Sequence, residues 1–531
     1  MRTHRFAAAA AALIVPAALL SAAPIAAAED PESPALSFVG RYANGGSEVS
    51  AALGDRLYVI GEGATLDIVN ISTPSAPVKV RTVDLAGFGA SITSVAATEG
   101  RVAVAMPAVD KTDNGAVVLL NPAGRVLRSA TVGANPDMLT FDPTGKRIVV
   151  ANEGEPNSYR PQDDPDGSVS IISVQELLAK KVDAVRTVGF TAFNVGAPRH
   201  SELPAGVRVF GPGASVAQDL EPEYAVVEGD TVFVTLQENN AIAEIDLASA
   251  TVTAIRALAA KDHSQPGNGL DASDRDNGAN GPAINIANWP VFGLPLPDGL
   301  ASFTAGGETY LISANEGDAR QDWPGYEEEI RVGSSAYRLD PTKFPNAAAL
   351  KNNAALGRLT VSKASGDTDG DGDYDRIEAF GTRSVTIWTT SGEVVWDSGD
   401  MIERATAAAY PLNFNASNRN SALDDRSDNK GPEPEGVSIG VIGSRTYAFV
   451  GLERIGGFIA CDITDPTSPT LVQYANSRDF SASAEAPTND SGPEVIEFVS
   501  ADDSPSGIPL VIVNNETSHT VSIWSFVPYG H

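Results

Sequence analysis

Short runs of alternating hydrophobic and polar residues recur along the chain, separated by turns rich in Gly, Pro and Asp. This alternation is typical of strands that bury one face, whereas long helical periodicity is scarce. The runs fall into groups of about four, and the first group covers residues 48–54, 56–62, 65–72 and 78–85. The pattern predicts an all-β chain made of repeated antiparallel units.

Seven such groups can be recognised, and the last is one strand short. The run 36–42, LSFVGRY, precedes the first group and could supply the missing outer strand. Four-stranded antiparallel sheets arranged radially, and closed by pairing of the N- and C-terminal strands, describe a seven-bladed β-propeller. A tandem of β-sandwiches is the alternative, but it explains neither the four-strand groups nor the leftover strand. Eight blades remain open if the long fifth group divides.

The N-terminus has the pattern of a secretory signal. Residues 1–28 have a basic start, an apolar run and Ala26-Ala27-Ala28 before Glu29, which indicates export and cleavage. A membrane anchor is the alternative, but the run is short. No later stretch approaches the ~20 apolar residues of a spanning helix. We therefore expect a secreted, extracellular monomer with no integral membrane segment in the mature chain.

The mature chain, 29–531, is interpreted as one propeller domain with four polar insertions. They lie near 194–219, 260–297, 318–357 and 402–432. Loops of this length in a compact fold are usually functional covers or surface decorations. Because so many acidic residues fall at strand ends, the interpretation as covers is favoured.

Composition limits the possible partners. The net charge is −31, which argues against nucleic acid and anionic membranes and favours cations. The single Cys461 excludes an internal disulfide framework and Cys-based metal clusters, and its apolar strand favours an inert buried thiol. With five His residues, a His-rich zinc site is not expected.

Acidic residues recur at corresponding positions of the groups. In the stretch 431–453, Glu433 and Glu435 open one strand and Glu453 ends the next, and an antiparallel hairpin places these ends at the same edge. We therefore predict an acidic rim at the mouth of the central channel. Such crowding disfavours full ionisation without cations, and oxygen-only ligands suit Ca²⁺ or Mg²⁺. Solvated acids at turns are the alternative. The predicted rim residues are Glu48, Glu62, Asp137, Glu153, Glu223, Glu238, Asp298, Glu316, Glu433, Glu435, Glu453, Glu494 and Glu516.

A second acidic motif, DTDGDGDYDRIE at 367–378, matches the twelve-residue calcium loop position by position. Gly372 falls at the sharp turn of such a loop, and the last residue is a potential bidentate ligand. A strand follows, not a helix, so a structural calcium clip is expected. An acidic disordered linker is the alternative. The predicted calcium residues are Asp367, Asp369, Asp371, Asp373, Asp375 and Glu378.

Signatures of other catalytic classes are missing. The sequence has no G-x-S-x-G elbow, H-E-x-x-H, P-loop, or dinucleotide fingerprint followed by a helix, which weighs against serine hydrolase, zinc protease and nucleotide chemistry. What remains is metal-assisted chemistry on an anionic substrate. Arg320, Arg454 and His519 are candidate helpers near rim acids, and no nucleophile is assigned.

The motifs PEPEG, ANEGE, ANEGD, DTDGDGDYD, IEAFGTRS and VNNET together resemble the choice-of-anchor I family of secreted bacterial propellers. The resemblance extends to mesenchyme-specific cell-surface glycoproteins of biomineralising animals and to alkaline phosphatase-like and phytase-like propeller proteins. It implies a rim role for Glu433, Glu435, Asn152, Glu153 and for Asn315-Glu316. This sequence departs from the family name by ending without an anchor.

Two functions follow as hypotheses. The first is a calcium-dependent phosphoesterase, a phosphoric ester hydrolase that acts on a small phosphorylated substrate through Ca²⁺ and a second divalent or transition metal at the rim. The second is a non-catalytic calcium-binding envelope, matrix or adhesion protein that binds mineral or an envelope component. A lactonase or another propeller hydrolase is a third, more distant reading.

Overall fold

The computed structural model describes residues 35–158, 160, 163–278, 281–321 and 325–527. The predicted signal peptide at 1–28 therefore lies outside the described residues. The described part is all-β, with 33 strands and only short helices. Among the described residues, no helix is long and apolar enough to cross a bilayer.

Seven sheets have four strands each and are antiparallel throughout. The first three in chain order are β2 (Ser50–Leu53), β3 (Arg56–Ile60), β4 (Thr65–Asn70) and β5 (Val78–Asp84); β6 (Ser94–Thr98), β7 (Arg101–Met106), β8 (Asn114–Leu120) and β9 (Val126–Ala134); and β10 (Pro136–Phe141), β11 (Arg147–Asn152), β12 (Ser168–Ser173) and β13 (Val185–Gly189).

The other four follow the same plan. They are β14 (Pro222–Glu228), β15 (Thr231–Leu236), β16 (Ala241–Asp246) and β17 (Thr251–Ala257); β20 (Leu300–Ala305), β21 (Glu308–Ala314), β25 (Val385–Thr389) and β26 (Val394–Asp397); β27 (Pro434–Ile442), β28 (Arg445–Leu452), β29 (Phe458–Asp462) and β30 (Thr470–Ala475); and β31 (Pro493–Val499), β32 (Leu510–Asn515), β33 (Thr520–Val527) and β1 (Ala35–Ala43).

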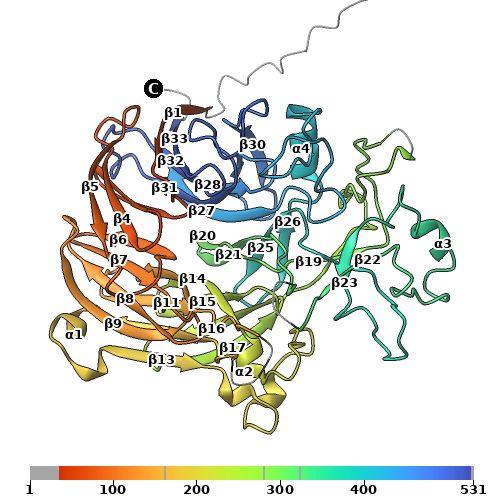
Figure 1. The fold of residues 1–531 in the computed structure, drawn as a ribbon, viewed down its shortest axis with the longest axis horizontal. Coiled ribbons are helices and arrows are strands. Elements are labelled where there is room, and N and C mark those ends of the chain that lie inside the picture. The colour runs from red at the N-terminus through yellow and green to blue at the C-terminus, as the bar shows by residue number, and fades with distance from the viewer. Residues whose placement is uncertain (1–34, 159, 161–162, 279–280, 322–324, 528–531) are drawn as a thin grey trace, which may run out of the picture.

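The first strand of each sheet contacts the first strand of the next. β2 lies against β6, β6 against β10, β10 against β14, β14 against β20, β20 against β27, β27 against β31, and β31 against β2. We call these the inner strands. Figure 1 shows the sheets arranged around a common centre, with β1 beside β33. The arrangement is propeller-like.

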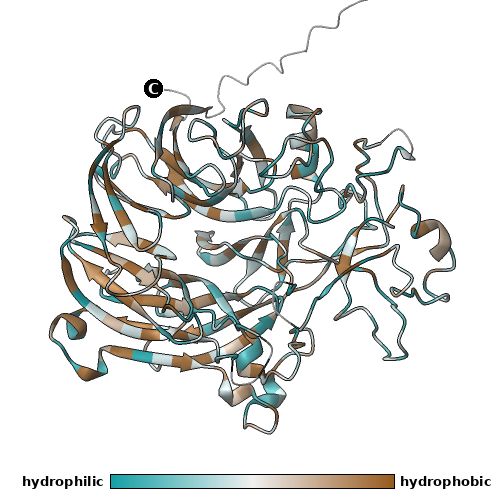
Figure 2. Ribbon diagram, viewed as in Figure 1, coloured by the Kyte–Doolittle hydropathy of each residue, from teal (hydrophilic) through white to brown (hydrophobic). Residues whose placement is uncertain are grey.

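Burial follows this geometry. The middle strands are covered on both faces, as in β32, whose six residues are all buried. The outer strand β5 is exposed at six of its seven positions. Figure 2 shows hydrophobic residues concentrated along the strands. Apolar clusters fill the spaces between neighbouring sheets, and one joins Leu57 and Val59 of β3 to Ile512 of β32 and Ile523 of β33. The last sheet therefore packs on the first.

Two of the predicted insertions, 260–297 and 318–357, form a further sheet together with the residues that follow the second of them. β18 (Lys261–Asp262), β19 (Phe292–Leu294), β24 (Glu378–Phe380), β23 (Thr360–Ser362) and β22 (Glu329–Arg331) form a five-stranded sheet, with β19 and β24 parallel. Its own apolar core includes Val332, Tyr337 and Leu356, each fully buried. Figure 1 shows β22, β23 and the short α3 (Ala347–Leu350) in a lobe beside the ring of sheets. The described residues of these segments therefore have a sheet and an apolar core of their own, and their role as covers stays a prediction.

One strand prediction is wrong. The strand expected after the 367–378 motif was the single run IEAFGTRSVTIWTT at 377–390, but this run divides into β24 and β25, which belong to different sheets. Gly381 and Arg383 between them have φ of +67° and +55°, a left-handed backbone that ends a strand.

The remaining helical elements of the described residues are α1 (Val174–Leu178), α2 (Val216–Asp219), α4 (Met401–Ala409) and the 3₁₀ turns Val182–Ala184, Thr191–Phe193 and His200–Glu202.

Candidate functional site

Five inner strands are preceded by, or begin with, a proline followed by an acidic residue. In four of them the pairing register shifts directly after the proline, so that the inner strand carries one extra residue. Such a bulge re-aims a side chain, and proline, which has no N–H to donate, is tolerated there. The five pairs are Pro136-Asp137, Pro222-Glu223, Pro297-Asp298, Pro434-Glu435 and Pro493-Glu494.

Close backbone contact brings these bulges together. Gly299 donates its backbone N–H to the carbonyl oxygen of Glu435 at 3.1 Å. A Cβ at Gly299 would lie 2.3 Å from that oxygen, and one at Gly436 would lie 2.2 Å from the carbonyl oxygen of Glu494. The glycine after the acid is therefore required for neighbouring inner strands to approach this closely.

All five of these acidic residues line one cavity of about 520 Å³ between the inner strands. Glu153, Glu316 and Glu497 line it as well, and Tyr224 and Gln237 add polar groups. Among the described residues that line it, none is Lys, Arg or His. The cavity is thus a strongly acidic enclosure without a cationic side chain in its wall.

The carboxylates of this cavity resist ionisation. Burial, followed by repulsion from Glu453 and Glu316, raises the pKa of Glu435 well above its usual value. Burial and repulsion from Glu48 raise the pKa of Glu494 in the same way. Oε2 of Glu435 and Oε2 of Glu494 are buried, and neither has a hydrogen-bond partner in the part of the chain that the structure describes. Unpartnered buried carboxylate oxygens fit an oxygen-ligated cation such as Ca²⁺.

Burial acts on the other cavity acids too. It raises the pKa of Asp137 to about 7, with repulsion from Glu155 as the second cause. It also raises the pKa of Glu497 to about 8, although Glu497 accepts hydrogen bonds from the backbone N–H of Ala52. The pKa values of Glu153, Glu223 and Asp298 are raised well above normal by burial and by their acidic neighbours.

Asn152 and Asn315 directly precede the acidic residues Glu153 and Glu316, and their side-chain amides hold the strand ends in place. Nδ2 of Asn152, which is fully buried, donates to Oγ of Ser170 at 3.0 Å. Nδ2 of Asn315 donates to Oγ1 of Thr382 and Oγ1 of Thr386, each at 2.8 Å. These amides point into the sheets, so they position Glu153 and Glu316 without lining the cavity themselves.

A second part of the predicted rim contains its own cations. Oε1 of Glu433 lies 2.5 Å from Arg426, and its Oε2 lies 3.1 Å from Lys430 and 2.7 Å from Arg454. Burial alone would raise the pKa of Glu433, but Lys430, Arg454 and Arg426 together lower it far below its usual value.

Lys430 and Arg454 also reach the neighbouring acids. Nζ of Lys430 lies 2.9 Å from Oε1 of Glu316, and Arg454 lies 2.6 Å from Oε1 of Glu453. We call Glu316, Glu433, Glu453, Lys430 and Arg454 the Lys430 cluster. Because Glu316 also lines the cavity, the Lys430 cluster adjoins it.

The other predicted rim residues and helpers lie elsewhere. Glu62 is exposed. Glu48 and Glu516 are outside the cavity wall, although repulsion from both acts on Glu494. Glu238 is buried, and burial raises its pKa to about 7.

Two helper candidates are already engaged. Arg320 is fully buried, and its guanidinium lies 2.8 Å from Oε2 of Glu221 and also pairs with Asp219. Nδ1 of His519 lies 3.1 Å from the carbonyl oxygen of Gly46. Arg454, the third candidate helper, contacts the rim acids Glu433 and Glu453 directly.

The 367–378 loop brings together part of its predicted ligand set. Asp367, Asp369 and Asp375 each offer an oxygen within 4.8 Å of the others. Asp371 and Asp373 are not part of this group, and Glu378 begins β24 with its carboxylate 3.5 Å from Arg376. Backbone N–H groups of the loop occupy several carboxylate oxygens, as where Gly370 donates to Oδ1 of Asp367 at 2.8 Å. Calcium binding by this loop stays a prediction.

Sequence reasoning missed Glu497 and Lys430. Glu497 lies three residues after Glu494, and alternation would turn the two to opposite faces, but the bulge in β31 turns both toward the cavity. Lys430 comes from an irregular segment that no strand pattern places. The recurrent Pro-acid pairs were the signal that could have identified the bulges.

Comparison with known proteins agrees with the motifs. The choice-of-anchor I domain matches residues 50–466. The chain belongs to the choice-of-anchor I family. The resemblance inferred from PEPEG, ANEGE and the other motifs is thereby confirmed. Family and relatives indicate a secreted or cell-surface β-rich protein.

Two relatives show where this choice-of-anchor I chain is similar to animal proteins. It is 28% identical to Gigasin-3a of Magallana gigas over 33% of this chain and 66% of that protein. It is 27% identical to mesenchyme-specific cell surface glycoprotein of Strongylocentrotus purpuratus over 38% of this chain and 30% of that protein. The chain thus spans less than two thirds of each relative's length.

Among solved structures, Kuenenia stuttgartiensis hydrazine synthase is similar with a TM-score of 0.44 and 13% identity, over 90% of this chain and 95% of that chain. A score at this level supports no inference about activity.

Proposed function

We propose that this protein is a secreted or cell-surface, seven-bladed β-propeller that binds Ca²⁺ in its central cavity. The blade count is supported by the ring of seven inner-strand contacts, and its closure by the pairing of β1 with β33. The observation that carries the binding proposal is the pair of buried, unpartnered oxygens, Oε2 of Glu435 and Oε2 of Glu494, in a wall without cationic side chains.

Binding follows from electrostatics. Bringing several carboxylates together in a buried space is unfavourable unless protons or cations compensate them. A hard divalent cation suits a wall of carboxylate oxygens, and Ca²⁺ tolerates the irregular geometry that bulged strands provide better than Mg²⁺ does. Glu435 and Glu494 would be the primary ligands, with Asp298 and Glu223 nearby in the wall.

The test is calcium titration calorimetry on the chelator-treated full chain near pH 7.5. We expect Glu494→Gln and Glu435→Gln to lose a binding event that the wild type shows. Glu62→Gln, which changes an exposed predicted rim residue, is the matched control and should bind as the wild type does. Unchanged titrations in both cavity variants would refute cavity binding.

A second candidate function, phosphoric ester hydrolysis, is favoured by the Lys430 cluster. A bound divalent cation would polarise a phosphoryl oxygen and lower the pKa of a coordinated water. The ammonium of Lys430, held 2.9 Å from Glu316 at the edge of the cavity, would place positive charge beside a phosphate. In this account Glu435 and Glu494 hold the cation, and Lys430 orients the phosphate.

Hydrolysis of a generic phosphomonoester by purified protein tests this candidate. We expect turnover with a divalent cation, loss of turnover in chelator, and a marked fall in kcat for Lys430→Met. No turnover with calcium, magnesium, manganese or iron would leave the non-catalytic binding function. The relative from Strongylocentrotus purpuratus is named as a cell surface glycoprotein, which favours a component of the cell envelope as the partner in that case.

A further inference from the structure

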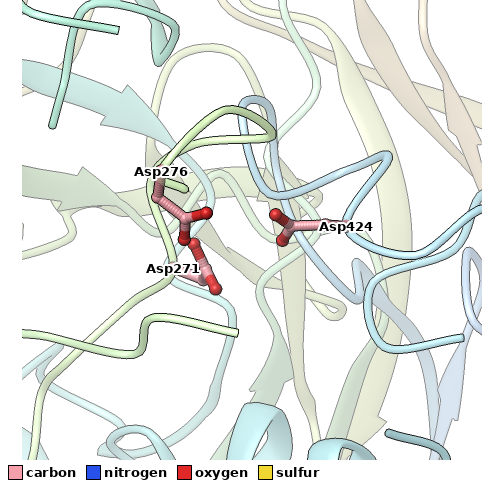
Figure 3. A group of neighbouring side chains, drawn as sticks. All are labelled: Asp271, Asp276 and Asp424. Carbon is pink, nitrogen blue, oxygen red and sulfur yellow. The ribbon is translucent and has the colours of Figure 1, made fainter. Parts of the chain in front are cut away.

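A group of three aspartates lies away from the central cavity, between two loops. Asp271 and Asp276 belong to the segment that links β18 to β19, and Asp424 to the segment that precedes β27. Figure 3 shows the three side chains pointing toward one another. One carboxylate oxygen of each lies within 4.8 Å of the others. None of them belongs to the predicted rim or to the calcium loop.

Each aspartate uses one oxygen to hold its own loop. Oδ2 of Asp271 accepts the backbone N–H of Asn285 at 2.5 Å, and Oδ1 of Asp276 accepts that of Ala283 at 2.9 Å. Oδ1 of Asp424 accepts the hydroxyl of Ser427. These bonds fix the carboxylates and leave their other oxygens for the space between the loops.

The remaining oxygens have no adequate partner. Asp424 is fully buried, and among the described residues its Oδ2 has no hydrogen-bond partner, like the buried Oδ2 of Asp276. Asp271 is also fully buried, and its Oδ1 accepts a long hydrogen bond, 3.5 Å, from the backbone N–H of Ser273. A buried, unpartnered carboxylate oxygen aimed at two further carboxylates is the arrangement expected of ligands for a cation.

No cationic side chain balances the group among its described contacts. Arg383 contacts the backbone of the group, where its guanidinium donates to the carbonyl oxygens of Asp271 and Ser427. The same guanidinium lies 2.6 Å from the carboxylate of Glu403. The charge of Arg383 is therefore matched by Glu403. Burial, with repulsion from Glu403, raises the pKa of Asp271 to about 7, and burial, with repulsion from Asp271, raises that of Asp424 to about 9.

We propose that Asp271, Asp276 and Asp424 form a structural Ca²⁺ site that joins the β18–β19 insertion to the segment before β27. Three carboxylates supply oxygen ligands and charge for a hard cation. Asp276 is partly buried, and Asp271 and Asp424 are buried. The site goes beyond the proposed function, since it shares no residue with the central cavity.

The site also explains how the Lys430 cluster is held. Asp424 begins the short stretch that carries Arg426 and Lys430, both of which pair with Glu433. The backbone of this stretch is strained at Asp424, with φ of +71°, and such a conformation persists only where its surroundings hold it. A cation that binds Asp424 would secure this stretch against the insertion.

The test uses the full chain, with Ca²⁺ counted by metal analysis after dialysis and melting followed in Ca²⁺ and in chelator. We expect Asp424→Asn to lose one bound Ca²⁺ relative to the wild type and to show a smaller rise in Tm on adding Ca²⁺. In chelator it should melt at or above the wild type, because the neutral amide replaces a buried carboxyl group whose ionisation is unfavourable there. Asp425→Asn, one residue along and exposed, is the matched control and should behave as the wild type does.

An unchanged Ca²⁺ count and an unchanged calcium-dependent rise in Tm for Asp424→Asn would overturn the proposal. If Asp424→Asn does not fold, the partly buried Asp276→Asn decides by the same two measurements. The loop variant Asp369→Asn and the cavity variant Glu494→Gln should each retain the Ca²⁺ ion that Asp424→Asn loses. This separates failure of the present site from failure of cavity binding.

Discussion

Glu433 and Glu435 stand two residues apart in one motif, yet they lie in opposite electrostatic surroundings. Glu433 is fully buried against Arg426, Lys430 and Arg454, which lower its pKa. Glu435 faces other carboxylates, which together with burial raise its pKa, and its Oε2 has no partner. The same strand start thus supplies one acid neutralised by cationic side chains of the protein and one that, among the described residues, has no cationic partner. Acidic crowding therefore indicates a metal site only where the chain provides no counter-charge.

The largest expected effect comes from removing the neutralised acid. Glu433→Gln removes the buried carboxylate that Arg426, Lys430 and Arg454 share, and breaking a buried pair of this kind costs about 3–5 kcal/mol. The free energy of unfolding, from denaturant titration, should fall by that amount both in Ca²⁺ and in chelator. The matched variant Glu435→Gln should stabilise the chelator-treated protein. An equal fall in the free energy of unfolding for Glu433→Gln and Glu435→Gln would contradict the difference between the surroundings of the two acids.

Lys430→Met tests the comparison between Glu433 and Glu435 by removing one of the cations that neutralise Glu433. It leaves Glu316 without its ammonium partner, but Glu433 keeps Arg426 and Arg454, so we expect a loss of about 2–3 kcal/mol. Added Ca²⁺ should recover part of this loss, because a divalent cation can replace the ammonium. Denaturant titration with and without Ca²⁺ measures both quantities. Absence of any recovery would show that the Lys430 cluster cannot accept a metal.

A smaller effect, with a defined direction, is expected in the pH dependence of the free energy of unfolding. In the folded protein, the pKa is raised to about 7 for Asp137 and to about 8 for Glu497. At a pH between the ordinary pKa of a carboxyl group and these raised values, the folded state holds protons that the unfolded state has lost. Stability in chelator should therefore fall as the pH rises from about 5 to 8, by up to about 1.4 kcal/mol per pH unit for each such proton. Ca²⁺ should flatten this slope. A slope that rises with pH in chelator would contradict the assignment.

Glu62→Gln should have the smallest effect. This predicted rim residue is exposed, and surface substitutions usually change stability by less than about 0.5 kcal/mol. Calcium affinity and the free energy of unfolding should both equal those of the wild type. A measurable loss of calcium binding in Glu62→Gln would show that Glu62 contributes to the calcium site and that the site extends beyond the cavity.

The alternating pattern was sufficient to predict the all-β fold and the grouping of strands, because burial of one strand face is a local property of the sequence. It predicted too that acids such as Asp137, Glu223 and Glu435 meet at one place, since hairpin geometry determines which ends lie together. It could not predict that Lys430 neutralises Glu433, because Lys430 lies in an irregular segment whose course no strand pattern specifies. It could not predict that Asp424 meets Asp271 either, because these two residues come from irregular segments far apart in the chain. The strand through Gly381 was mispredicted because a turn between two sheets leaves the hydrophobic pattern intact.

The most direct test of the central claim is anomalous diffraction from crystals of the full chain grown in Ca²⁺, which locates the ions themselves. We predict an anomalous peak in the central cavity, at about 2.3–2.6 Å from carboxylate oxygens of Glu435 or Glu494, and no peak among Glu433, Lys430 and Arg454. A cavity without a peak, in crystals that show Ca²⁺ elsewhere on the molecule, would contradict the claim that its acids are left for an external cation.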